Sequence, residues 1–119
     1  MGQRKLFIVM VRAELEDSIE GLEELSVICK HRLNSGEITN YVYNENEALL
    51  HQEISGLKKL LPIVDTVKTE DYQDVHDLAQ KLEALLTARV EKLQGPQAVS
   101  GIVSRKIRKI LNYILEWPE

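Results

Sequence analysis

The stretch Pro62-Ile-Val-Asp-Thr-Val-Lys-Thr-Glu-Asp71 contains the point, at about Thr69, where the pattern of the chain changes. Before Thr69, short apolar runs with strand character alternate with segments of helical spacing. After it, apolar residues recur at steps of three and four, which is the spacing of one face of a helix. The change predicts a small α/β unit over residues 1–68, followed by a helical hairpin over residues 69–119.

Three strands are predicted before the change. Lys5-Leu-Phe-Ile-Val-Met-Val11 is a continuous apolar run, as in a strand that is covered on both faces of a sheet. Residues 37–44 alternate between two faces, one of which carries Tyr41 and Tyr43. Residues 62–68 form a short third strand.

Two helices are predicted between these strands. The first spans residues 16–33, has acidic first turns and a basic last turn, and ends at Gly36, which can adopt the left-handed conformation. The second begins at a capping box formed by Asn44 and Glu47, and Pro62 limits its continuation.

After Thr69, one helix is expected from Glu70 to Gln94, and a second one runs to about Leu115 after a break at Gly95-Pro96. The order β-α-β-α-β-α-α favours a three-stranded parallel sheet with right-handed crossovers. The alternative is a ferredoxin-like α+β arrangement, in which one of the predicted helices is wrong. A chain of 119 residues fits one domain, because a second core would be too small.

Composition limits the classes of function. The net charge of −4 argues against a general nucleic-acid binder. Cys29 is the one cysteine, so an intrachain disulfide is excluded. The chain has neither a signal peptide nor an apolar run near 18 residues, so we expect a cytoplasmic protein without a membrane span.

Short catalytic motifs are missing from the sequence. It contains neither of the glycine-rich phosphate loops GxGxxG and GxxxxGK[ST], and it lacks CxxC, HExxH and GxSxG. Asp74 and Asp77 share a helical face but His76 does not, so no metal site is predicted. We therefore lean away from an enzyme and expect no cofactor.

The predicted sheet offers one candidate ligand site, because open α/β sheets bind ligands beyond the carboxyl ends of their strands. Two cations and several polar groups would meet there and could hold a carboxylate or a phosphate. These residues are Arg12, Asn44, Asn46, Lys68 and Thr69. Many acidic residues crowd the same ends, however, and pairing of Arg12 and Lys68 with them is the simpler interpretation.

The last helix carries the densest positive cluster, formed by Arg105, Lys106, Arg108 and Lys109. Such a cluster could contact the phosphates of a nucleic acid. It is also the pattern expected of the solvated face of an amphipathic helix, and in an acidic protein we favour that interpretation.

Our preferred hypothesis is a non-catalytic interaction or regulatory module that forms a homodimer through its C-terminal helices. Their apolar residues exceed what a narrow sheet could cover, although an intramolecular hairpin would also explain the pattern. The expected contact residues are Leu82, Leu86, Val90, Leu93, Val103, Ile107, Ile110 and Leu111. Trp117 could cap the core or anchor a contact between subunits.

Overall fold

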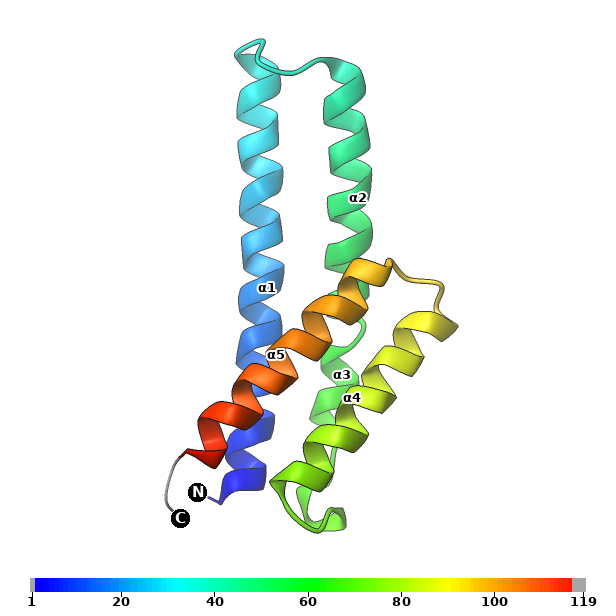
Figure 1. Ribbon diagram of the computed structural model, residues 1–119. Coiled ribbons are helices and arrows are strands. Elements are labelled where there is room, and N and C mark those ends of the chain that lie inside the picture. The colour runs from blue at the N-terminus through cyan, green and yellow to red at the C-terminus, as the bar shows by residue number, and fades with distance from the viewer. Residues whose placement is uncertain (1, 117–119) are drawn as a thin grey trace.

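The computed structural model describes residues 2–116, and within that range it contains helices and no strand. The elements are five α-helices and a 3₁₀ turn (Figure 1). In chain order they are α1 (Gln3–Asn34), α2 (Asn40–Lys58), α3 (Leu61–Asp65), the 3₁₀ turn η1 (Thr69–Asp71), α4 (Val75–Lys92) and α5 (Gln97–Leu115). Trp117 lies outside the described residues.

Two helical hairpins form the molecule. α1 and α2 run antiparallel as a long hairpin, and α4 and α5 form a shorter one that lies against its lower half (Figure 1). The molecule measures 54 × 30 × 18 Å and has a radius of gyration of 16.7 Å. A compact chain of this length would have a radius of gyration near ~13.5 Å. The difference reflects the upper half of the α1–α2 hairpin, which extends beyond the other helices (Figure 1).

The core is confined to the lower half. α1 contributes Phe7, Val11, Leu15 and Ile19, and no residue of α1 after Ile19 is buried. α2 contributes only Leu57 to this core. The remaining buried side chains come mainly from α4 and α5 and are aliphatic.

The predicted α/β fold is wrong, as is the ferredoxin-like alternative, because residues 2–116 form no sheet. The expected strand at residues 5–11 is the first part of α1. There α1 packs against α3, α4 and α5, and this burial on several sides requires an apolar surface almost all round the helix. A short run of this kind looks the same in a buried strand and in a buried helix.

The other two expected strands are also helical. Thr39 is the N-cap of α2, and its Oγ1 accepts a hydrogen bond from the amide of Val42 at 3.2 Å. The capping box at Asn44 is therefore wrong, since α2 begins at Asn40. Residues 62–68 form α3 and the loop after it, where Pro62 occupies a first-turn position that suits its missing amide donor.

The predicted ends of the helices are correct in part. Gly36 has a φ of 79°, which confirms the left-handed turn after α1. The break at Gly95-Pro96 and the helix that ends at Leu115 are also confirmed. The start at Glu70 is wrong, because α4 begins at Val75 after the Asp74 N-cap.

The upper half of the α1–α2 hairpin is joined along a narrow seam of partly buried residues. On each helix these residues recur at alternating steps of three and four, as in a coiled coil. They are Leu22, Ser26, Cys29 and Leu33 on α1, and Tyr43, Glu47, Leu50 and Ile54 on α2. Ser26 Oγ lies 2.8 Å from both carboxylate oxygens of Glu47, which sets these two residues opposite each other.

Candidate interaction surface

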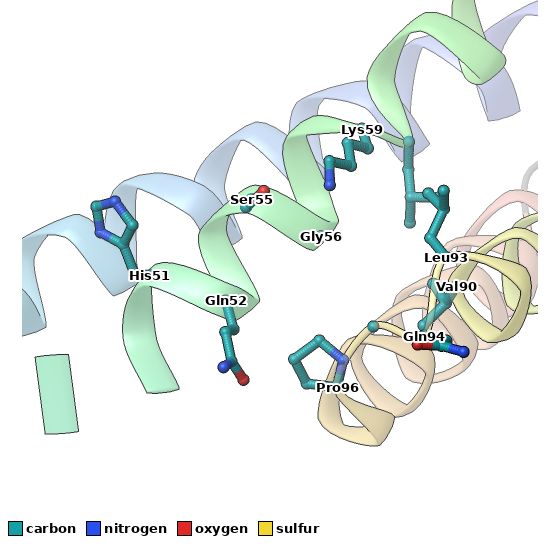
Figure 2. Close-up of a pocket in the computed structure, with 11 residues that line it drawn as sticks. His51, Gln52, Ser55, Gly56, Lys59, Val90, Leu93, Gln94 and Pro96 are labelled. Carbon is teal, nitrogen blue, oxygen red and sulfur yellow. The ribbon is translucent and has the colours of Figure 1, made fainter. Parts of the chain in front are cut away.

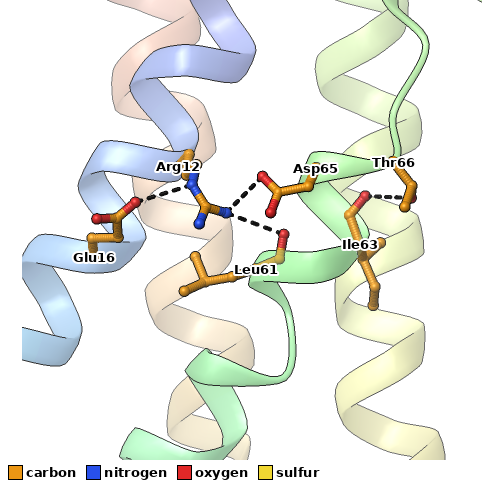
Figure 3. Close-up of polar contacts among 6 residues, drawn as sticks. All are labelled: Arg12, Glu16, Leu61, Ile63, Asp65 and Thr66. Atoms are coloured by element: carbon orange, nitrogen blue, oxygen red, sulfur yellow. Dashed lines mark hydrogen bonds and ion pairs between the residues drawn. The ribbon is translucent and has the colours of Figure 1, made fainter.

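The ligand site expected at the strand ends has no sheet to build it. Arg12 lies on α1 and binds Asp65 Oδ1 at 2.6 Å and Glu16 Oε1 at 3.1 Å (Figure 3). Its guanidinium also donates to the carbonyl of Leu61, so α1 is tied to α3. These contacts agree with the simpler interpretation, in which Arg12 pairs with acidic residues at the surface.

The other residues of that predicted site lie on different elements. Asn44 and Asn46 are on α2, whereas Lys68 and Thr69 lie at the 3₁₀ turn η1. The carbonyl of Thr69 accepts a hydrogen bond from Arg4 at 3.2 Å, which anchors η1 to α1. The structure therefore separates these residues instead of gathering them around one ligand.

The basic cluster of α5 is paired with acidic residues of neighbouring helices. Lys106 Nζ lies 2.7 Å from Glu14 Oε2, and Lys109 Nζ lies 3.5 Å from Glu14 Oε1. Arg108 lies 3.6 Å from Glu83 of α4, and Arg105 is exposed. The hydrogen bond from Lys106 is the main cause of a lowered pKa at Glu14, whereas burial acts in the opposite direction.

The apolar contact residues predicted on the C-terminal helices lie mainly inside the molecule. Six of them are buried in the core of this single chain: Leu82, Leu86, Val90, Val103, Ile107 and Ile110. Leu111 is partly buried, and Leu93 is 45 % exposed. α4 and α5 pack against each other and against α1, so the pattern arises from contacts within the chain.

No predicted acidic cluster is placed to bind a metal. Asp74 Oδ1 accepts from the amide of Asp77 at 2.8 Å, and Asp77 Oδ2 accepts from the amide of Gln73 at 3.0 Å. This reciprocal arrangement caps the first turn of α4. Among residues 2–116, no group of three or more His, Cys, Asp or Glu side chains could hold a metal ion.

One open hollow of about 420 Å³ lies between α2 and the end of α4 (Figure 2). Gln52 and Lys59 line it from α2, and Val90, Leu93 and Pro96 line it from α4 and the α4–α5 loop. Its walls are mainly apolar with few polar groups, so it offers shape without an evident set of converging ligands. His51 also lines a second hollow, of about 780 Å³, on the opposite flank of the α1–α2 hairpin.

The most distinctive surface lies on the upper half of the α1–α2 hairpin. Leu25 and Ile28 each lie 14 residues beyond Val11 and Glu14, close to four helical turns, and so on the same side of α1. That is the side that α5 covers, since Glu14 binds Lys106 and Lys109. Above α5 the same side is uncovered (Figure 1).

α2 continues this surface. A Cβ on Gly56 would lie 3.1 Å from Val99 Cγ2, which places α5 against Gly56. Leu49 and Val42 precede Gly56 by 7 and 14 residues, close to two and four turns, so they share its side of α2. We call Leu25, Ile28, Val42 and Leu49 together the tip face.

The tip face is unusually apolar for an exposed surface. Its side chains are 47 % (Leu25), 43 % (Ile28), 39 % (Val42) and 55 % (Leu49) exposed. The opposite flank of the same segment exposes two large apolar side chains, Val27 and Tyr41. A concentration of exposed apolar residues on one side of a structure is typical of an interaction site.

Sequence reasoning missed the tip face, although a signal for it was present. A two-helix seam needs one apolar stripe on each helix. α1 offers Leu25, Val27 and Ile28 in addition to its seam residues. Assigning Leu25 to the seam and Val42 to a strand concealed this excess.

Comparison with protein-family models, with curated proteins and with solved structures gave no match. In residues 2–116, no helix is both long enough and apolar enough to cross a membrane.

Proposed function

We propose that this protein is a non-catalytic interaction module and that the tip face is its binding surface. The observation that carries the proposal is the continuation of one apolar side of the hairpin beyond the end of the helix that covers it. Below, this side packs against α5 and forms core; above, Leu25, Ile28 and Leu49 remain more than 40 % exposed. Burying such side chains against a partner is favourable, at about 25 cal/mol for each Å² of apolar area.

The shape of the hairpin suits this role. Its upper half has a seam but no buried residue, so two helices alone leave most of their apolar residues in contact with water. Helical hairpins of this kind are completed when another helix or hairpin packs on the open side, as in four-helix bundles. An added helical partner would supply the layer that α4 and α5 supply below.

The alternative functions draw less support. Lys106, Arg108 and Lys109 are engaged by Glu14 and Glu83, which reduces the positive potential available to nucleic-acid phosphates. The anion site expected around Arg12 and Lys68 depended on strand ends, and residues 2–116 form no sheet.

Site-specific photocrosslinking in the producing cells tests the proposal. A photoreactive amino acid at position 28 samples the tip face, and the same group at position 27 samples the opposite flank of the same turn. We expect a discrete crosslinked product from position 28 that is absent or much weaker from position 27. Equal products from both positions, or none from either, would contradict an interaction through the tip face.

A further inference from the structure

We infer that the partner of the tip face is a second copy of this chain, packed head to tail about a two-fold axis. The inference rests on the proposed function and specifies its partner. In this arrangement the two upper hairpin halves overlap, and their lower halves point in opposite directions. Four helices then form the missing layer, with α1 against α1 and α2 against α2 of the partner.

The position of α5 selects the direction of the partner. α5 lies on the same side of the hairpin as the tip face but covers only the lower half (Figure 1). Two copies packed with their tips at the same level would bring the two α5 layers into collision. With one copy reversed, each tip lies over the uncovered half of the other copy and ends near its α4–α5 loop.

Charge at the two ends of the tip face supports the reversed arrangement. Arg32 lies 7 residues after Leu25, and therefore on the same side of α1 close to the tip. Glu53 lies four residues after Leu49, at the other end of the tip face. Because Ser26 is opposite Glu47, Glu53 is level with Glu20, so Arg32 and Glu53 are roughly 18 Å apart along the hairpin.

A reversed second copy brings each Arg32 to the level of the partner's Glu53, and this gives two equivalent pairs of opposite charge. Such self-complementarity is the requirement for a two-fold interface. Copies with their tips at the same level would instead place both Arg32 side chains at one end. Within the chain, Arg32 lies 3.8 Å from Glu37 and both side chains are mostly exposed, so this pair can be exchanged at low cost.

The available area indicates a weak dimer. The overlap covers residues 21–34 of α1, roughly 20 Å in length, and a hairpin is roughly 20 Å wide. The buried area is therefore on the order of 1,000 Å² in total, at the lower end of specific interfaces. We expect a dissociation constant in the micromolar range.

Sedimentation equilibrium across micromolar concentrations gives the first measurement. The mass of one chain is 13.6 kDa, and we expect the average mass to rise towards twice this value. Leu25→Glu should keep the chain monomeric, because it places a charge at the centre of the contact. Val27→Glu, on the opposite flank, is the matched control and should dimerise like the unmodified chain. Circular dichroism checks that both variants are helical.

Charge reversal tests the head-to-tail direction. Arg32→Glu and Glu53→Arg should each weaken dimerisation by about tenfold, because each creates two like-charged pairs. The double variant Arg32→Glu/Glu53→Arg should restore it, since opposite charges face each other again. An equal mixture of the two single variants should also dimerise more strongly than either alone.

The outcomes separate this inference from the proposed function. A chain that stays monomeric at all concentrations but crosslinks to another protein from position 28 would overturn self-association and leave the interaction surface in place. A dimer that Leu25→Glu does not weaken, or that the double charge variant does not restore, would overturn the head-to-tail packing. Crosslinked products of twice the chain mass from position 28 support the inference.

Discussion

Ser26 of α1 places its hydroxyl 2.8 Å from both carboxylate oxygens of Glu47 on α2, within a seam whose other positions are mainly apolar. This contact lies in the half of the hairpin that has no buried residue. A polar pair in a coiled-coil seam favours one register over its neighbours, because a shift by one turn leaves the carboxylate without its donor. The register in turn determines which side chains form the tip face.

Replacing Ser26 with Ala should destabilise the protein, even though alanine is the better helix former. The lost hydrogen bond to a carboxylate costs about 1 kcal/mol in this partly exposed setting. Ser18 is the matched control, because its hydroxyl bonds only to the carbonyl of Glu14 on its own helix, at 3.0 Å. Ser18→Ala should be neutral or slightly stabilising. Urea unfolding measures both, and equal effects would contradict a role for Ser26 in joining the helices.

The ion pair between Glu14 and Lys106 predicts a dependence of stability on pH. The pKa of Glu14 is lowered below its ordinary value of 4.5 in the folded chain. Its contribution is therefore complete above the unfolded pKa and is lost as the pH falls through the folded pKa.

Glu14→Gln should lower the melting temperature at pH 7, and the difference from the unmodified chain should shrink below pH 4.5 and vanish in strong acid. Glu20→Gln, at an exposed position of the same helix, is the control and should change little at any pH. Melting curves recorded from pH 2 to pH 7 provide the comparison. A constant difference across that range would show that Glu14 acts through packing and not through its charge.

The first turn of α4 depends on Asp74. Asp74→Ala removes the acceptor for the amide of Asp77 and should cost about 1 kcal/mol of unfolding free energy. Asp71→Ala serves as the comparison, because Asp71 lies in the 3₁₀ turn η1 and gives the helix no cap in this structure. Thermal unfolding of the two variants should differ by several degrees, and matching values would argue against the cap.

The helical assignment of residues 5–11 predicts a contrast between two neighbouring positions. In the helix, Phe7 is 0 % exposed and Val9 is 53 % exposed, whereas in a strand the two side chains would share a face. Phe7→Ala should therefore cost about 3–5 kcal/mol, because it leaves a cavity in the core. Val9→Ala should change the unfolding free energy by less than about 0.5 kcal/mol. Large losses at both positions would favour a strand.

Sequence patterns were most informative where a helix has one buried face. Val103, Ile107 and Ile110 recur at helical spacing, and they are buried along one side of α5. The same reasoning failed at residues 5–11, because α1 is enclosed there by several helices and has no polar stripe to reveal its period. It failed again at Tyr41 and Tyr43, since alternation over so few residues also fits the first turns of a helix capped by Thr39.

The sequence by itself determined the breaks and the periodic helices of this protein: the turn at Gly36, the interruption at Gly95-Pro96, and the apolar face of α5. These features depend on local chemistry, namely backbone freedom, a missing amide donor and side-chain spacing. Only the tertiary structure decided which apolar residues are core and which are surface. Leu86 is buried and Leu49 exposed although both lie on amphipathic helices, because α4 lies within the packed lower half and the upper half of α2 extends beyond it.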